Sequence, residues 1–191
     1  MANKYTTKTK VENYILEDID ASFSDQIDSW IEVVSKDIEN YTKRVFTTTT
    51  EDRLFDGNGK RTLWIDDAQA INKIERADEY YGDTFSEITD YITRPNNELP
   101  ITRVELKDTW FYKGKQNIKI NADWGYSATT PEDIEFAATV LVAGIINSNK
   151  NADGIESEKI GDYSVKYSNT KQQEDYQKAI SILDSYTKYE L

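Results

Sequence analysis

The sequence predicts an α+β protein in which a small helical bundle carries an inserted antiparallel β region. Apolar residues recur at steps of three and four near 25–44, 131–148 and 171–188, which is the spacing of helices that bury one face. Between them, over about 50–126, apolar and polar residues alternate, which is typical of strands. The chain has 191 residues, enough to bury a sizeable core. We therefore expect one domain over 1–191 with a β-rich insertion.

Two helices are expected before the insertion. Residues 9–19 carry a weak helical pattern. A stronger pattern follows Ser24, whose hydroxyl can cap a helix, and Asp25, which suits the positive end of the helix dipole. It predicts a helix from 25 to about 44. Its apolar stripe consists of Ile27, Trp30, Ile31, Val34, Ile38, Tyr41 and Val45.

The middle of the chain gives strand and turn signals. Residues 53–55 and 62–65 flank Asp56-Gly57-Asn58-Gly59, and both Asp-Gly and Asn-Gly tolerate the positive φ that tight turns need. This predicts a hairpin. Residues 80–99 are polar, with Pro95 and then Pro100 as breakers, and are expected to be irregular. Further strands are predicted at 71–74, 109–112 and 117–126, the last with Ile118, Ile120, Ala122 and Trp124 alternating.

The clearest helix start is Thr130-Pro131-Glu132-Asp133. Thr130 can cap the helix, Pro131 suits the first position because no N–H donor is needed there, and the two acids favour the dipole. Apolar residues then cover most of the circumference, which predicts a buried central helix over 131–148. A final helix is predicted at 171–188 from Tyr176, Ala179, Ile180, Leu183 and Tyr186.

The composition excludes several classes of function. Acidic residues number 35 against 23 basic ones, and the net charge of −12 argues against wrapping nucleic acid. The chain has no cysteine for disulfides or thiolate metal sites, and no histidine for general-base catalysis or metal binding. No signal peptide is recognisable, and the longest apolar run, 136–146, is too short to span a bilayer. We expect a cytoplasmic protein without a membrane segment.

No motif predicts a catalytic, cofactor-binding or metal-binding site. Asp56-Gly57-Asn58-Gly59 begins like an EF-hand loop, but Lys60 stands at the next ligand position and no glutamate stands at the twelfth. Glu156, Glu158 and Asp162 could be paired carboxylates for glycoside hydrolysis. In so acidic a chain they are better explained as a solvated face, since no partner that would tune their pKa is visible.

Residues 155–168 are the best candidate contact surface. The stretch from Ile160 to Tyr167 places Tyr163, Val165 and Tyr167 at period two, which predicts a short strand after Gly161. No neighbouring strand is evident in the sequence, so we expect this strand to pair with a distant strand or with another chain. The candidate subunit or partner interface comprises Ile160, Gly161, Asp162, Tyr163, Val165 and Tyr167.

The chain is rich in aromatic residues, with 13 tyrosines, 4 tryptophans and 6 phenylalanines. Trp30 lies on a predicted helix stripe, and the other three tryptophans lie on predicted strands, so core packing is the expected role of all four. Tyrosine and tryptophan are also common at interfaces. Tyr163 and Tyr167 are the better interface candidates because their strand has no evident neighbour.

Five segments of the chain, taken in this order, are similar to a known family. They are IENYTKRVF (38–46), DGNGKRTLWI (56–65), AINKIERA (70–77), WGYSATTPEDIEFAATVLVA (124–143) and SEKIGDYSVKYS (157–168). The last segment, just before the final helix, is the most specific. Together they resemble the head–tail connector, or head-completion adaptor, proteins of long-tailed bacteriophages and related prophages. The resemblance covers the chain from about residue 10 to its end, although the stretch from about 50 to 126 is longer than in compact members.

The resemblance implies a structural virion protein without catalysis or cofactor. Such proteins form a ring, usually of twelve copies, beneath the portal protein at the vertex of the packaged head. The ring extends the DNA channel and offers a docking platform to the stopper or tail-completion protein. A ring needs head-to-tail contacts that close, and strand addition between chains could supply them. Acids facing the channel would keep passing DNA from adhering.

Two alternatives remain open at this point. An acidic DNA-mimic inhibitor would need one dense acidic face, whereas acids and bases interleave here, as between Glu156 and Lys166. A tail-associated or carbohydrate-binding module would be favoured by the tryptophans and predicts exposed aromatic platforms on the β region.

Overall fold

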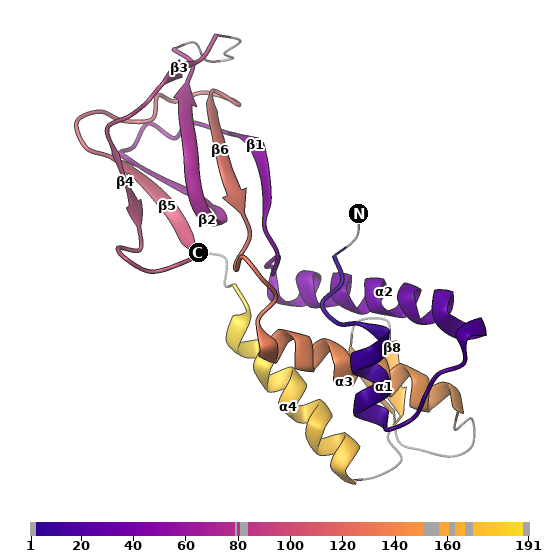
Figure 1. Cartoon of the computed structure of the whole chain (residues 1–191). Helices are drawn as coiled ribbons and strands as arrows, with labels where there is room; N and C mark the ends of the chain where they lie inside the picture. The colour runs from indigo at the N-terminus through magenta and orange to yellow at the C-terminus, as the bar shows by residue number, and fades with distance from the viewer. Residues whose placement is uncertain are drawn as a thin grey trace. The chain divides into compact units, whose positions relative to one another are not determined.

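The computed structural model describes residues 3–78, 80, 84–150, 157–160, 163–166 and 170–188. They form four α-helices, a six-stranded antiparallel sheet and a separate two-stranded sheet, which confirms the predicted α+β class (Figure 1). The chain divides into two compact units. The helical unit combines Met1–Arg44 with Thr130–Leu191, and the β unit is Val45–Thr129. The expected insertion, about 50–126, falls within the β unit.

The helical unit is built around its third helix. It contains α1 (Lys8–Ile15), the short 3-10 helix η1 (Ala21–Phe23), α2 (Ser24–Thr42), α3 (Glu132–Lys150) and α4 (Thr170–Tyr186). Helix α3 contacts α1, α2 and α4. It is buried around most of its circumference, as its all-round apolar pattern predicts. Its buried apolar residues are Ile134, Ala137, Ala138, Val140, Leu141, Val142, Ala143, Ile145 and Ile146.

The helix starts differ in detail from the sequence prediction. Ser24 is the first residue of α2 and not its cap, because Phe23 takes the cap position without a side-chain hydrogen bond. The Ser24 hydroxyl instead accepts a hydrogen bond from Lys8 Nζ at 3.0 Å. Helix α3 begins at Glu132, and the Pro131 carbonyl accepts a hydrogen bond from the Glu135 N–H at 2.9 Å. The proline therefore stands at the helix start, where its missing N–H costs nothing.

The β unit is one sheet with strand order β1-β6-β2-β5-β4, and β3 pairs with the end of β2. Strand β2 is long enough to serve two neighbours. Its first part pairs with β5 and its second part with β6, and the register shifts within each of the two pairings. The strands are β1 (Thr49–Phe55), β2 (Thr62–Arg76), β3 (Ser86–Glu87), β4 (Tyr91–Arg94), β5 (Ile101–Leu106) and β6 (Ile118–Trp124).

The predicted hairpin between the first two strands is wrong, because β6 lies between β1 and β2. The glycine-rich connection is held by a later segment of the chain. The Gly57 N–H donates to Asn117 Oδ1 at 2.9 Å, and the Gly59 N–H donates to the Phe111 carbonyl at 2.8 Å. A Cβ on Gly57 would lie 1.8 Å from the Tyr112 carbonyl oxygen, so glycine is needed there for close backbone approach.

Other strand predictions need correction as well. Residues 71–74 are not a separate strand but part of β2, and 109–112 form no strand. The apolar pattern of 109–112 nevertheless reflects burial, because Phe111 is fully enclosed and hydrogen-bonds through its backbone to Lys60 and Gly59. Strands β3 and β4 both lie inside the stretch 80–99, so the expectation of an irregular stretch is wrong for these residues. The strand predicted at 117–126 is confirmed as β6.

The core of the β unit is formed by side chains of β2, β5 and β6 together with Phe111. Trp124 is its largest side chain, and its Nε1–H donates to the Glu51 carbonyl at 2.9 Å. The Phe55 ring lies 5.7 Å from the Trp124 ring, and the Arg53 guanidinium lies 4.7 Å from the same ring. The buried cluster is Leu63, Ile65, Ala68, Ile74, Ile101, Val104, Leu106, Phe111, Ile118, Ile120, Ala122 and Trp124.

Within the part of the chain that the structure describes, no helix combines the length and the apolar character that crossing a membrane would require.

Candidate assembly surfaces

The candidate segment near the last helix is a local hairpin and not a lone strand. Strand β7 (Ser157–Ile160) pairs antiparallel with β8 (Tyr163–Lys166), with Ile160 opposite Tyr163. The expectation of a strand without a local partner is therefore wrong. Gly161-Asp162 separates the two strands in the sequence, and Gly-Asp is a dipeptide typical of two-residue hairpins. That signal would have found the hairpin.

The predicted interface residues are only partly covered by the described chain. Ile160, Tyr163 and Val165 belong to the hairpin, and β8 lies against α3 within the helical unit. Gly161, Asp162 and Tyr167 lie outside the described residues. The three acids weighed for catalysis are divided likewise: Glu158 stands opposite Val165, while Glu156 and Asp162 are outside the described residues.

The tryptophans do not share one environment. Trp124 is 2% exposed, as expected for a core residue, and Trp30 is half-buried. Trp64 and Trp110 are 55% and 51% exposed, so the expectation of core packing is wrong for both. Leu63 and Ile65, which flank Trp64 in β2, are buried in the core. Successive side chains of a strand point to opposite faces of the sheet, so Trp64 points outward.

Trp64 lies in a row of side chains across three adjacent strands. It stands opposite Arg103 on β5, and Arg103 stands opposite Arg94 on β4. The Arg103 guanidinium lies 4.9 Å from the centroid of the Trp64 ring, which is a cation–π contact. Arg94 Nε is 3.2 Å from Glu105 Oε2 on β5. We call the outer side of the sheet formed by Trp64, Ile92, Arg94, Arg103 and Glu105 the Trp64 face.

Arg103 carries a positive charge without an acidic partner within the described chain. Among the residues that the structure describes, the Arg103 side chain makes no hydrogen bond or ion pair. Its guanidinium contacts the Trp64 ring instead. By contrast, Arg94 is paired with Glu105, and Arg53 is paired with both Glu51 and Asp66. The donors of the Arg103 guanidinium are therefore available to a ligand or partner that carries an anionic group.

The second exposed tryptophan belongs to a different arrangement. The Arg76 guanidinium lies 4.0 Å from the Tyr112 ring, and Arg76 Nη1 donates to the Trp110 carbonyl at 3.4 Å. Arg76 Nε is also 3.6 Å from Asp78 Oδ1. These contacts hold the 110–112 segment on the end of β2. Unlike Arg103, Arg76 already has an anionic partner.

In the EF-hand-like loop the first acid, Asp56, is already engaged in an ion pair with Lys115. Asp56 Oδ2 accepts from Lys115 Nζ at 2.5 Å, and Asp56 Oδ1 accepts from the Gln116 N–H at 2.9 Å. These hydrogen bonds hold the pKa of Asp56 below its usual value. Across the described stretches of the chain, no group of three or more acidic residues is arranged to hold a metal ion.

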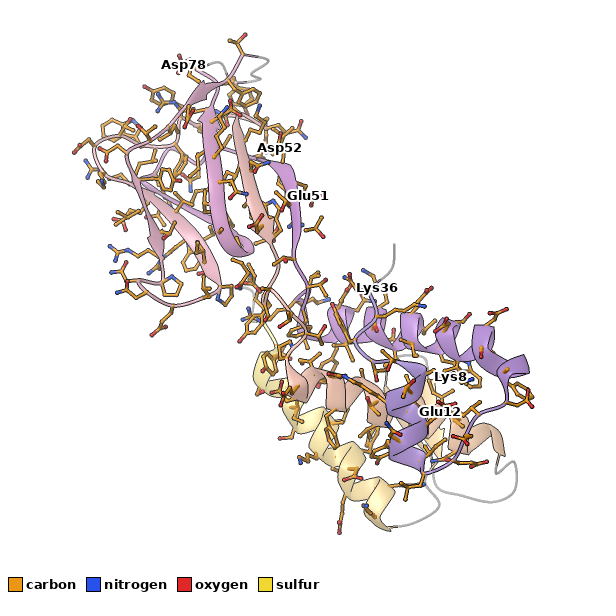
Figure 2. The ribbon with its side chains drawn as sticks, viewed as in Figure 1. Lys8, Glu12, Lys36, Glu51, Asp52 and Asp78 are labelled. Carbon is orange, nitrogen blue, oxygen red and sulfur yellow. The ribbon has the colours of Figure 1, made fainter. Side chains whose placement is uncertain are left out.

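A second exposed surface lies in the helical unit, where α1 turns toward α2. Leu16 is 90% exposed and adopts a left-handed backbone conformation with φ of 58°, and Phe23 is 55% exposed. Glu12, labelled on α1 in Figure 2, supports this turn: its Oε1 accepts from the Ile19 N–H at 3.0 Å and lies 3.6 Å from Lys8 Nζ. We call residues 16–25 the acidic segment.

These observations describe surfaces suited to protein contacts. Aromatic and arginine side chains together are typical of the centres of protein interfaces. The exposed Trp64 and Trp110 were missed from the sequence because a tryptophan among apolar neighbours gives the same pattern whether it faces in or out.

The overall fold is shared with proteins from the necks of gene transfer agent particles. No protein-family model matches the sequence, and no characterised protein resembles it closely enough in sequence to count as a relative. The likeness therefore rests on the arrangement of the chain in space.

Three solved structures illustrate it. A chain from the neck of a native particle computed with C12 symmetry aligns over 100% of this chain and 97% of its own, with a TM-score of 0.57 and 12% identity. One from the neck of an empty particle computed with C6 symmetry covers 88% and 80%, with a TM-score of 0.57 and 11% identity. One from the virion of a native gene transfer agent particle covers 88% and 79%, with a TM-score of 0.54 and 13% identity.

Proposed function

We propose that the chain is a structural virion protein of the neck, acting as a head–tail adaptor in a tailed phage or a phage-like particle. In this proposal twelve copies form a ring beneath the portal protein and extend the DNA channel. The ring offers a docking platform to the stopper or tail-completion protein. It assembles in the host cytoplasm and stays in the finished particle.

The observation that carries this proposal is the likeness to a neck protein over nearly the full length of both chains. The alignment with the C12 neck covers 100% of this chain and 97% of the other. Both the helical unit and the β unit are therefore included. The twelve-fold ring is taken from that symmetry and from the family resemblance of the sequence.

The composition of the chain favours assembly over catalysis. It has no histidine or cysteine, and the Trp64 face suits a protein contact. The net charge of −12 per copy would make a ring strongly acidic. Acids that line the channel would repel DNA within about 10 Å at ordinary salt, so DNA would pass without adhering.

The β7–β8 hairpin remains our candidate for a contact with the portal or with a neighbouring copy. Because β7 and β8 pair with each other along one edge, the contact that we propose does not require the addition of a lone strand to another sheet. Changing Tyr163 and Tyr167 to serine should weaken co-assembly of the purified chain with its portal. Equal co-assembly of this variant and the original chain would contradict the assignment.

The adaptor function is tested by removing the gene from the producing phage or prophage and examining particles by electron microscopy. We expect heads that contain DNA but carry no tail, and restoration of tails when the gene is supplied in trans. In intact particles, a tag on the chain should locate it in a ring at the portal vertex. Particles that lack the protein, or tailed particles without the gene, would contradict the proposal.

A carbohydrate-binding role is a second candidate, favoured by the exposure of Trp64 and Trp110 on the β unit. It predicts that purified chain binds cell-wall glycan, and that Trp64→Ala or Trp110→Ala abolishes this binding. An acidic DNA-mimic is less well supported, because lysines and arginines pair with acids on both units, as in Lys4–Glu32 and Lys107–Asp90.

A further inference from the structure

We propose that the Trp64 face of one copy binds the acidic segment, residues 16–25, of a second copy of the same chain. This inference rests on the proposed ring, in which every copy presents both surfaces and each surface meets the other on the adjacent copy. Contacts between unlike surfaces of identical chains are the kind that close into rings.

The Trp64 face has the chemistry of a receptor for carboxylates. Arg103 presents a guanidinium that has no carboxylate partner within the described chain and is held on the Trp64 ring at 4.9 Å. Stacking on an aromatic ring leaves the N–H fork at the edge of the guanidinium able to bind a carboxylate through two parallel hydrogen bonds. Trp64 itself adds a large apolar area beside the charge.

The acidic segment offers the complementary groups. Asp18 and Asp25 are exposed, and neither side chain makes a hydrogen bond or ion pair with the described residues. Leu16 and Phe23, exposed to 90% and 55%, lie in the same short segment. No lysine or arginine occurs between Val11 and Ser35, where the acids are Glu12, Glu17, Asp18, Asp20, Asp25, Asp28 and Glu32.

The acidic segment is also held in a defined shape. Glu12 accepts a hydrogen bond from the Ile19 N–H, and the Phe23 N–H donates to the Asp20 carbonyl at 3.0 Å. Lys8 Nζ lies within hydrogen-bond distance of the Ser24 hydroxyl at the start of α2. A segment that is already ordered loses less conformational entropy on binding, which favours its use as a contact.

A copy of the same chain is the occupant that the charges favour. A nucleic acid could also offer anions to Arg103, but a chain with a net charge of −12 repels it overall. The acidic segment brings carboxylates and apolar side chains together, and the Trp64 face presents a guanidinium and an indole together. Both halves of the contact are therefore satisfied at once.

The test uses charge reversal in the full-length chain. Arg103→Glu reverses the Trp64 face, and the pair Asp18→Lys with Asp25→Lys reverses the acidic segment. Each variant should need at least about tenfold higher concentration than the original chain for self-association, because like charges then meet across the contact. Sedimentation velocity gives the association, and negative-stain electron microscopy shows whether rings form.

An equimolar mixture of the two variants is the decisive sample. The reversed face of one variant can accept the reversed segment of the other, and the two unreversed surfaces also match. We therefore expect the mixture to recover association that neither variant shows alone. Lys113→Glu and Glu174→Lys are matched controls, since both side chains are exposed and make no interaction within the described chain. They should leave association unchanged.

The outcomes separate this contact from the proposed function. Rings that form equally well with Arg103→Glu would overturn the contact while leaving the neck assignment intact. A mixture that fails to recover association, while one chain carrying all three changes does recover it, would place the contact within a single chain and overturn the proposal. If Arg103→Glu lost binding to duplex DNA without losing self-association, the Trp64 face would be a nucleic-acid site, and the proposed contact would be overturned.

Absence of self-association by the original chain, alone and with its portal, would overturn the contact. Electron microscopy of particles would then still test the neck assignment independently.

Discussion

The helical unit and the β unit differ in how far along the sequence their contacting residues lie. A helix is held by hydrogen bonds between residues four apart, so its signals are local, as at Thr130 to Asp133 before α3. In the sheet, β1 pairs with β6, and Thr49 stands opposite Trp124. The difference teaches that local pattern identifies an element in either unit, but identifies its neighbours only where those neighbours are close in sequence.

The two units also differ in what they leave exposed. Within the described residues, large exposed side chains of the helical unit are Leu16, Phe23 and the half-exposed Tyr41. The β unit exposes more of them, and two are tryptophans. Its exposed large apolar residues are Val45, Leu54, Trp64, Tyr80, Leu99, Trp110 and Tyr112. The β unit is therefore where partner contacts are the better explanation of aromatic content.

The largest effect should distinguish a buried from an exposed tryptophan in the β unit. Trp124→Ala should lower the free energy of unfolding of this unit by about 3–5 kcal/mol, because it leaves a cavity and removes the hydrogen bond to Glu51. Trp64→Ala should change it by no more than about 0.5 kcal/mol. Urea unfolding followed by far-ultraviolet circular dichroism measures both. Similar losses in the two variants would refute the distinction.

Two glycines test the contact between the connection from β1 to β2 and the 111–117 segment. Gly57→Ala should cost about 3 kcal/mol, because the new methyl group would overlap the Tyr112 carbonyl and the backbone must move. Gly59→Ala is the matched control: φ is +74° there, but the nearest atom to an added methyl group, Lys113 Cβ, would lie at an ordinary 3.9 Å, so about 1–2 kcal/mol is expected. Thermal unfolding of both variants gives the comparison. A larger loss for Gly59→Ala would contradict the close approach.

In the helical unit, Glu39 on α2 fastens the start of the chain. It accepts hydrogen bonds from Asn3 at 2.7 Å, from Tyr5 at 2.8 Å and from Lys36 at 2.9 Å. Burial alone would raise the pKa of Glu39, but these hydrogen bonds outweigh burial and lower it. The charged form is therefore the one that stabilises the folded unit.

Glu39→Gln should cost about 1–3 kcal/mol at neutral pH. Because the folded pKa is lowered, this stabilisation is present above the ordinary carboxyl pKa of 4.5 and is lost as pH falls through the lower folded value. The difference between the variant and the original chain should therefore shrink in acid. Urea unfolding at several pH values measures it. A difference that stayed constant down to strong acid would show that charge plays no part.

The smallest effect is expected at an exposed ion pair of the β unit. Lys107 Nζ lies 2.7 Å from Asp90 Oδ1, with both side chains about half exposed. Lys107→Ala should leave unfolding unchanged within error, because solvent screens the pair and the Lys107 N–H still donates to the Asp90 carbonyl. A measurable loss of stability would mean that surface charges contribute more to this sheet than its core contacts suggest.

The sequence predicted the helices because their signals are local, and it predicted β6 because Ile118, Ile120, Ala122 and Trp124 alternate without a break. It could not place β6 between β1 and β2, since Asp-Gly and Asn-Gly mark a turn but do not say which strands the turn joins. Nor could it separate Trp64 from Trp124. Facing in or out depends on which side of β2 packs with β5 and β6 into one core, and no local pattern carries that information.

Gly161-Asp162 is the opposite case. This dipeptide is a local signal for a two-residue hairpin, whereas the strand after it was expected to pair with a distant strand or another chain. The candidate surfaces followed the same rule. The hairpin could have been predicted from its turn, whereas the row of Trp64, Arg103 and Arg94 depends on the register of three strands and needed the structure.

The placement of β6 has a consequence for how the chain is made. Synthesis runs from the N-terminus, so β1 and β2 leave the ribosome long before β6, the strand that must lie between them. The sheet can close only once Trp124 has emerged. The helical unit must wait longer still, because α3 and α4 come last. The middle of the chain can therefore complete its fold first, while α1 and α2 lack their contacts with α3 until the final third of the polypeptide has been made.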